Sequence, residues 1–255
     1  MASFDFKEKK YLVTGAGRGI GRAIAKALVA KGCKVYALNR SKEPLDTLVS
    51  EHPEIVPIVA DVRDWEDIRR KLDGVDTLDG LINNAVTYPP RELPALQWDQ
   101  ANLQDSIDGN ILGPINVLQI VAQKMVASER PGSIVNISSV ASLQAIPGRL
   151  PYCMTKAALD MITKQFALEL GPYNIRVNSI NPTLVLTENI QSLIDSGIPV
   201  PDMYIPKTPM KRVAKMEEIV SPVLYLLSDM SSMVTGTLQV IDGGIMATFA
   251  TKTSG

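Results

Sequence analysis

The stretch Thr14-Gly-Ala-Gly-Arg-Gly-Ile-Gly21 decides the fold, because it joins a short β-branched run to a helical pattern near the start of the chain. Glycines in such a turn permit tight backbone bends and let N–H groups at a helix N-terminus approach a pyrophosphate. The spacing is Gly15-x-x-x-Gly19-x-Gly21 rather than G-x-G-x-x-G. An ordinary strand-to-helix turn could have the same sequence pattern, so the rest of the chain is needed to distinguish it from a cofactor-binding turn.

Beyond this turn, short apolar runs alternate with longer helical patterns. We expect strands at Tyr11–Thr14, Lys34–Leu38, Ile55–Val59, Gly80–Ile82, Ser133–Ile137, Ile175–Ile180 and Thr237–Val240. We expect helices at Gly19–Ala30, Glu43–Val49, Trp65–Leu72, Gln100–Ser128, Tyr152–Leu170 and Met216–Leu227. Such alternation indicates βαβ units with right-handed crossovers. The prediction is therefore α/β: a single doubly wound Rossmann domain over residues 1–255, with a mainly parallel seven-stranded sheet and helices on both faces.

Three local features refine this prediction. Pro114 removes a backbone donor and should kink the Gln100–Ser128 helix just after Asn110. Gly171, followed by Pro172, should end the long helix with a left-handed C-cap. The weakly periodic segment at about 187–210 is interpreted as a substrate loop, since loops of that length are usually functional.

The composition excludes several classes of partner. The chain is 45% hydrophobic and 21% charged with a net charge of −1, and no block of like charge suggests a nucleic-acid or membrane surface. No run of about 18 apolar residues could cross a bilayer, and residues 1–10 lack the apolar stretch of a signal peptide. Cys33 and Cys153 make neither a disulfide framework nor a metal cluster. We therefore expect a cytoplasmic protein without a metal site, a nucleic-acid partner or membrane contact.

The end of the second predicted strand indicates which dinucleotide is bound. An NAD site would carry a carboxylate there for the ribose 2′-hydroxyl, but the sequence reads Ala37-Leu-Asn39-Arg40-Ser41. The guanidinium of Arg40 suits a 2′-phosphate, and Arg18 in the glycine turn could add a second cation. Both could instead be ordinary surface arginines. The pattern favours NADP(H).

A second group of residues suggests proton transfer. Tyr152 and Lys156 are spaced to share a helical face, and a nearby cation favours the phenolate of a tyrosine whose free pKa is about 10. Ser139 ends an apolar strand, so its hydroxyl should reach the crevice at the carboxyl ends of the strands. There it could donate to a substrate oxygen as that oxygen gains charge. Alone, the Tyr-x-x-x-Lys spacing would more often be a surface pair.

Taken together, these motifs resemble the short-chain dehydrogenase/reductase family over nearly the whole chain. The resemblance rests on the Thr14–Gly21 turn, Asp61-Val62, Asn83-Asn-Ala85, Asn110, Ser139, Tyr152-x-x-x-Lys156 and Asn181-Pro182. It implies that Tyr152 is the general acid in reduction, that Ser139 holds the substrate oxygen, and that Lys156 binds the nicotinamide ribose and lowers the pKa of Tyr152. It further implies that Asn110 positions a water that links Lys156 to solvent.

The resemblance also implies the residues that hold the cofactor. They are Gly15, Arg18, Gly19, Ile20, Gly21, Asn39, Arg40, Asp61, Val62, Asn83, Ala85, Pro182, Val185 and Thr187, together with Tyr152 and Lys156. Within this set Asp61 and Val62 would meet the adenine, Asn83 the adenosine ribose, and Val185 and Thr187 the carboxamide end. The chain departs from the family's pattern at Val86 and at Thr183, where glycines are usual, and both changes could alter loops near the nicotinamide.

Within the family, the chain most resembles dicarbonyl and L-xylulose reductases. This similarity implies reduction of α-dicarbonyls or short sugars with NADPH, by a homotetramer. Ser139, Val140, Arg149 and Tyr152 are then the expected substrate contacts, although Val140 and Arg149 stand where that group would carry Gln and His. Two alternatives remain open: the same chemistry on a 3-oxoacyl thioester or a steroid ketone, and an NADP(H)-binding regulator without turnover.

Overall fold

The computed structural model describes residues 4–199, 202 and 204–247. Seven parallel strands form one sheet in the order β3-β2-β1-β4-β5-β6-β7. Their bounds are Lys10–Thr14 (β1), Lys34–Asn39 (β2), Val56–Val59 (β3), Gly80–Asn83 (β4), Gly132–Ile137 (β5), Ile175–Pro182 (β6) and Leu238–Ile241 (β7). The strand order reverses between β1 and β4, which in doubly wound folds places a crevice at the carboxyl ends of these strands. The predicted fold class is confirmed.

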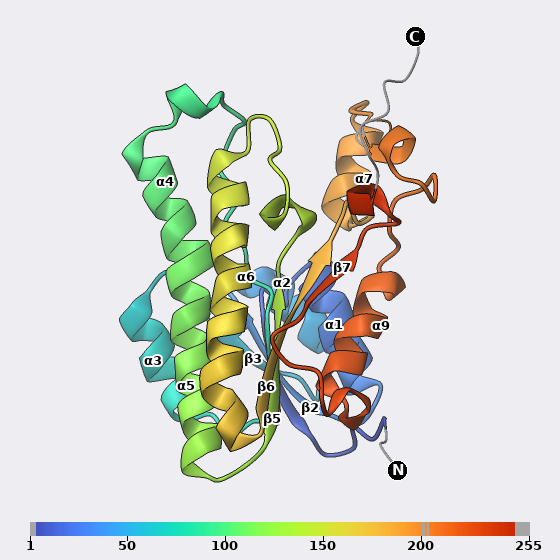
Figure 1. The fold of residues 1–255 in the computed structure, drawn as a ribbon. Helices are drawn as coiled ribbons and strands as arrows, with labels where there is room; N and C mark the ends of the chain where they lie inside the picture. The colour runs from blue at the N-terminus through green and yellow to red at the C-terminus, as the bar shows by residue number, and fades with distance from the viewer. Residues whose placement is uncertain (1–3, 200–201, 203, 248–255) are drawn as a thin grey trace.

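Helices cover both faces of the sheet, as Figure 1 shows. Their bounds are Gly19–Val29 (α1), Lys42–Glu51 (α2), Trp65–Asp73 (α3), Gln100–Ile107 (α4), Gly113–Ala127 (α5), Leu150–Leu170 (α6), Glu188–Asp195 (α7) and Glu217–Leu227 (α9). Helices α1, α2 and α9 bury apolar side chains against one face, while α3, α5 and α6 bury theirs against the other. The sheet is therefore covered on both sides, which explains its nearly all-apolar strands. Among the described helices, none has the length and hydropathy needed to cross a bilayer.

The interruption predicted from Pro114 takes the form of a π-helical turn at Asp108–Leu112, between α4 and α5. Pro114 itself is the second residue of α5, which directly follows the π-helical turn, and its ring leaves no N–H to donate there. Asn110 lies inside the π-helical turn and is almost fully buried. Such turns occur frequently at functional sites.

Two local predictions need correction. Gly171 is right-handed, with φ −53°, and a 3₁₀ turn at Gly171–Tyr173 carries the chain to Asn174, which takes the left-handed conformation at φ 57°. Asparagine tolerates that region, so the left-handed residue comes three residues later than predicted, while α6 itself ends at Leu170 as predicted. The predicted loop at about 187–210 also contains helix α7, which Thr187 caps by accepting a hydrogen bond from the Ile190 N–H at 3.3 Å. Residues 200, 201 and 203 of this segment lie outside the described residues.

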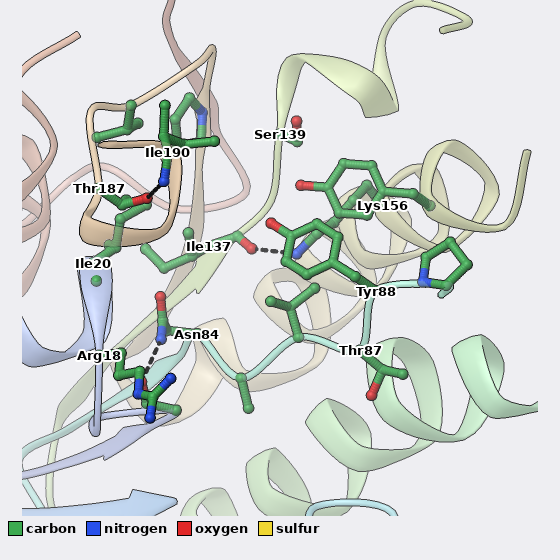
Figure 2. A pocket seen from close by; sticks show the side chains of 18 of the residues that line it. Arg18, Ile20, Asn84, Thr87, Tyr88, Ile137, Ser139, Lys156, Thr187 and Ile190 are labelled. Carbon is green, nitrogen blue, oxygen red and sulfur yellow. Dashed lines mark hydrogen bonds between the residues drawn. The ribbon is translucent and has the colours of Figure 1, made fainter. Parts of the chain in front are cut away.

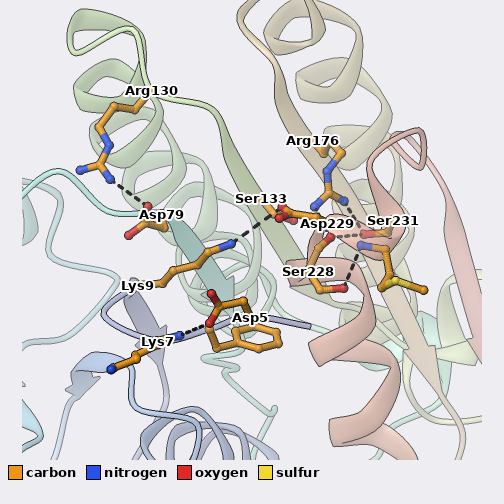
Figure 3. A network of polar contacts seen from close by, with 12 residues as sticks. Asp5, Lys7, Lys9, Asp79, Arg130, Ser133, Arg176, Ser228, Asp229 and Ser231 are labelled. Atoms are coloured by element: carbon orange, nitrogen blue, oxygen red, sulfur yellow. Dashed lines mark hydrogen bonds and ion pairs between the residues drawn. The ribbon is translucent and has the colours of Figure 1, made fainter. Parts of the chain in front are cut away.

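The amino ends of the strands are tied together by polar contacts (Figure 3). Arg130 pairs with Asp79 at 3.0 Å. Arg176 donates to the Ser231 hydroxyl at 2.7 Å and to the Ser228 carbonyl at 3.1 Å. These contacts connect strand starts to neighbouring helix ends. They fix the end of the sheet opposite to the crevice, so we read them as structural.

Candidate active site

A cleft of about 820 Å³ opens at the carboxyl ends of the strands. Arg40 lies at its β2 end, and Ser139 and Tyr152 lie at its β5 and α6 end. Seventeen of the sequence-predicted site residues line this cleft. They are Gly15, Arg18, Gly19, Ile20, Asn39, Arg40, Asp61, Val62, Ala85, Ser139, Val140, Arg149, Tyr152, Lys156, Pro182, Val185 and Thr187. Gly21, Asn83 and Asn110 do not.

The glycine turn leaves an open cradle at the N-terminus of α1. Gly15 and Gly19 have φ of 64° and 55°, in the region that favours glycine. A Cβ on Gly15 would come within 2.8 Å of the Ala85 Cα, so the turn and the segment after β4 touch through backbone. Arg18, the N-cap of α1, makes no side-chain capping bond. The first N–H groups of the helix are therefore open to an anionic ligand, as a pyrophosphate site requires.

Gly21 contributes through packing rather than by lining the cleft. A Cβ there would lie 2.4 Å from both the Gly15 carbonyl oxygen and the Asn84 Nδ2. Asn84 donates from Nδ2 to the Thr14 and Gly15 carbonyls at 2.9 and 3.2 Å. In return, the Thr14 hydroxyl accepts from the backbone N–H groups of Asn84 and Ala85, each at 3.0 Å. The cradle is thus held by Asn84, which sequence reasoning did not select.

Asn83 is a correction. Its Nδ2 donates to the Pro114 carbonyl at 3.2 Å and to the Asn136 Oδ1 at 3.1 Å, and the residue is 3% exposed. Successive side chains of a strand point to opposite faces, and Asn83 points into the face that α5 covers. It therefore does not reach a ribose in the cleft. Asn84, one residue on, lines the cleft instead.

The β2 end of the cleft carries the cation predicted from the sequence. The Arg40 side chain is 65% exposed, and its Nη1 lies 3.9 Å from the Asp61 Oδ2. Asp61 is held mainly by Arg63, whose Nε lies 3.1 Å from both carboxylate oxygens. Partial burial works against ionisation of Asp61, but these hydrogen bonds keep its pKa below the usual range. Arg40 is therefore only loosely engaged and can turn toward a phosphate.

Ser139, Tyr152 and Lys156 converge at the other end. In Figure 2, Ser139 and Lys156 lie on the same side of the pocket, away from Arg18 and Ile20. The Lys156 Nζ donates to the Ile137 carbonyl at 2.7 Å and lies 5.7 Å from the centre of the Tyr152 ring. The Ser139 side chain also takes part in hydrogen bonding with the Tyr152 phenol. Ser139, two residues after the end of β5, is thus brought beside Tyr152 and Lys156, which lie in the first two turns of α6.

The electrostatics of these groups follow from burial. Removal from water raises the pKa of the Tyr152 phenol well above its ordinary value, nearby Tyr88 adds to the rise, and hydrogen bonding with Ser139 opposes it. Burial lowers the pKa of Lys156 to about 8, although the Asp160 carboxylate acts in the other direction. The expected lowering of the Tyr152 pKa by Lys156 is not seen, because desolvation dominates and the ammonium is turned to Ile137. Tyr152 is therefore a protonated phenol at neutral pH.

Asn110 is fixed in place by its side chain. Its Oδ1 accepts from the Thr87 N–H at 2.7 Å, and its Nδ2 donates to the Thr87 carbonyl at 2.9 Å and to the Thr155 hydroxyl at 3.2 Å. The side chain is thus committed to protein groups and lies outside the cleft. It fastens the segment after β4 to the start of α6.

That segment supplies residues that sequence reasoning missed. The Tyr88 ring stacks on the Tyr152 ring with centroids 5.2 Å apart and planes tilted by 24°. Glu92 accepts a hydrogen bond from the Arg149 Nε at 2.7 Å. Both residues line the cleft, as do Ile146, Leu193 and Tyr204. For Tyr88, the one signal in the sequence was its place three residues after the Asn83-Asn-Ala85 motif.

The cleft fits a nicotinamide dinucleotide at both ends. The glycine cradle excludes side chains where a pyrophosphate would lie, loosely held cations stand at the β2 end, and a phenol and an ammonium stand at the other. No cluster of three or more metal-ligating side chains occurs within the described part of the chain. These features define a class of protein: an α/β enzyme that binds a nicotinamide dinucleotide, with a tyrosine and a lysine at one end of the cleft.

Comparison with known proteins gives the family. A family model described as enoyl-(acyl carrier protein) reductase matches residues 15–246. The chain belongs to the short-chain dehydrogenase/reductase family, which uses nicotinamide cofactors, and it is an oxidoreductase. The predicted family resemblance is therefore confirmed.

Individual members of the family are also similar to this chain. The chain is 42% identical over 240 residues to L-xylulose reductase of Mus musculus, which covers 94% of this chain and 97% of that protein. It is 40% identical over 243 residues to D-erythrulose reductase of Gallus gallus, covering 95% and 97%. A solved gluconate 5-dehydrogenase of Burkholderia cenocepacia, in complex with NADP and tartrate, is 30% identical with a TM-score of 0.87, covering 96% and 99%.

Proposed function

We propose that the chain reduces small carbonyl compounds with NADPH, and that Tyr152 donates the proton. The observation that carries this proposal is the convergence of Tyr152, Ser139 and Lys156 in the cleft that also contains the glycine cradle. A non-catalytic regulator is disfavoured, since the chain belongs to an enzyme family and its relatives are reductases.

The groups divide the reaction between them. NADPH supplies a hydride to the carbonyl carbon. The Tyr152 phenol, kept protonated by burial, gives its proton to the carbonyl oxygen, so that hydride and proton together form the alcohol. The Ser139 hydroxyl donates a hydrogen bond to the same oxygen as charge develops on it. Lys156 holds its charge beside the phenol and is in place to bind the nicotinamide ribose.

Removing the phenolic oxygen tests this mechanism. Tyr152→Phe should lower kcat by at least about a hundredfold, the usual contribution of a positioned acid. Its affinity for NADPH should change little, because the cradle is untouched. The measurement is the loss of NADPH absorbance with L-xylulose and diacetyl, beside NADPH binding by fluorescence titration. A variant that kept most of its activity would refute the role of Tyr152.

The choice of NADPH over NADH rests on Arg40 and Arg18. Both line the cleft at the β2 side, where no carboxylate ends the strand, and the solved relative that holds NADP has the same fold. Arg40→Asp should weaken NADPH binding by on the order of a hundredfold and NADH binding far less, since the new charge repels only the 2′-phosphate. Dissociation constants for both cofactors decide this. Equal weakening of the two would contradict the preference.

Small neutral sugars and α-dicarbonyls are the proposed substrates. The relatives act, by their names, on L-xylulose and D-erythrulose, and Val140 and Arg149 line the substrate side of the cleft. 3-Oxoacyl thioesters and steroid ketones remain the competing substrates. A panel that contains all these compounds, read by NADPH consumption with NADH as control, separates them.

We also propose that the enzyme works in the cytoplasm as a homotetramer. Helix α6 exposes Met161 and Leu168, which are 62% and 74% exposed, on the side turned away from the sheet. Large apolar side chains spaced along one helix suit burial against a second copy.

A further inference from the structure

An ion pair stands at the substrate side of the cleft. The Arg149 Nε donates to the Glu92 Oε1 at 2.7 Å, and the Arg149 Nη2 makes a second, short contact with the same oxygen. The two residues come from separate loops: Glu92 from the segment after β4, and Arg149 from the turn that precedes α6. Both line the cleft.

Arg149 stands near the reacting groups. Its guanidinium acts on the Tyr152 phenol and favours the ionised form, although burial of the phenol has the larger, opposite effect. Tyr88, stacked on Tyr152, and Tyr204 share this wall of the cleft. A permanently charged planar fork at such a place would ordinarily bind a carboxylate on the substrate.

Glu92 already occupies that fork, and backbone contacts hold it there. The Leu93 N–H donates to the Gly148 carbonyl at 3.2 Å, directly beside both members of the pair. A Cβ on Gly148 would lie 3.0 Å from the Glu92 Cβ, so the two loops are in close contact. The Trp98 Nε1 donates to the Leu93 carbonyl at 3.0 Å and braces the segment from behind. The fold therefore fixes the backbone from which Glu92 reaches Arg149.

We propose that Glu92 selects uncharged keto substrates over keto acids by neutralising Arg149 and presenting its own carboxylate to the cleft. A substrate carboxylate would have to displace Glu92 from the guanidinium and would meet its negative charge. The hydroxyl groups of a neutral ketose can hydrogen-bond to both members without separating them. This inference rests on the proposed function, because it concerns the substrate of that same site.

The pair is partly open to water, with side chains 37% and 58% exposed for Arg149 and Glu92. Solvent screens charges at such a site, so the selection should be moderate and should depend on salt. We expect an effect on the order of tenfold rather than thousands.

The test compares two substrates that differ by one group. They are L-xylulose and the pentulosonate in which the CH₂OH group farther from the ketone is oxidised to a carboxylate. In Glu92→Gln, the ratio of kcat/KM for the pentulosonate to that for L-xylulose should rise on the order of tenfold over the wild-type ratio. The rise should shrink at high salt. Adding Arg149→Gln should return the ratio to near the wild-type value, because the released cation is gone.

The matched control is Glu218→Gln, which breaks an ion pair with Arg212 away from the cleft. It should leave the ratio unchanged. A second readout is the dissociation constant of each sugar for the enzyme loaded with NADP⁺, a complex that cannot turn over a ketone. There too, Glu92→Gln should shift the ratio toward the pentulosonate.

The outcomes separate the two proposals. If both sugars are reduced but Glu92→Gln leaves the ratio unchanged, the selection by Glu92 is wrong and the reductase stands. If the wild-type enzyme consumes NADPH with neither sugar, nor with the rest of the carbonyl panel, the proposed reaction is wrong. The ratio of dissociation constants then decides the role of Glu92 by itself.

Discussion

At the scale of the residue, the burial of Lys156 in the site lowers the stability of the folded state at neutral pH. The side chain is 3% exposed, and burial lowers its pKa from 10.5 to about 8. In the unfolded chain the amine keeps its ordinary pKa, so between pH 8 and 10.5 the unfolded state binds a proton that the native state does not. Stability from this residue is therefore lowest below pH 8 and rises with pH through that window.

This difference predicts a pH-dependent effect of Lys156→Met. Going from pH 7 to pH 10, the wild type should gain stability relative to the variant, by up to about 3 kcal/mol. Other titrating groups are common to both proteins and cancel in the comparison. Urea unfolding of the two apo proteins at both pH values measures it. Parallel stabilities across this range would show that Lys156 keeps its ordinary pKa.

At the scale of the element, the glycine turn works because backbone meets backbone. Gly21→Ala would place a Cβ 2.4 Å from the Gly15 carbonyl oxygen, which cannot move without opening the cradle. We expect a loss of about 1–3 kcal/mol in the free energy of unfolding, as for overpacking in a core, together with weaker NADPH binding.

Gly74→Ala is the control for that substitution. Gly74 follows α3, has a negative φ of −80°, and would meet nothing within 4 Å. Its unfolding free energy and NADPH affinity should stay near those of the wild type. If Gly21→Ala behaved as mildly as Gly74→Ala, the turn would not be as close-packed as the structure indicates.

The elements themselves were largely predictable from sequence. Apolar β-branched runs and the glycine turn located all seven strands to within two residues at their ends, because buried parallel strands have a distinctive composition. Helix α7 was missed, although the sequence offered a local signal for it: the N-cap residue Thr187, followed by Ile190, Leu193 and Ile194 at helical spacing. The end of α6 at Leu170 was predicted correctly, but the left-handed residue was placed at Gly171 instead of Asn174, because either residue type tolerates that conformation.

The site was predictable in its chemistry but less so in its geometry. Motif spacing identified Tyr152, Ser139 and Lys156, but could not say which of two adjacent asparagines, Asn83 or Asn84, turns toward the cleft. That choice depends on the face that α5 covers. Glu92 was missed because its partner lies 57 residues away, and only the folded loops bring them together.

At the scale of the whole molecule, the two ends of the sheet have different tasks. The amino ends are fixed by ion pairs and hydrogen bonds such as Arg130–Asp79 (Figure 3), while the carboxyl ends open into the cleft. Loops at the open end can therefore vary in sequence without loss of the frame. The departures from the family's pattern at Val86 and Thr183 both lie at this end and line the cleft.

The outer side of α6 is the surface through which we expect copies of the chain to assemble into a tetramer. Met161 and Leu168 expose 62% and 74% of their surface there, and a second copy would cover them. We expect the wild type to sediment with the mass of a tetramer. Met161→Glu combined with Leu168→Glu should shift it to smaller species, because buried unpaired carboxylates are costly. Met233→Glu is the control, since Met233 is 96% exposed in the segment between α9 and β7. A wild type that sediments as a monomer at micromolar concentration, or a double variant that stays tetrameric, would place the assembly surface elsewhere.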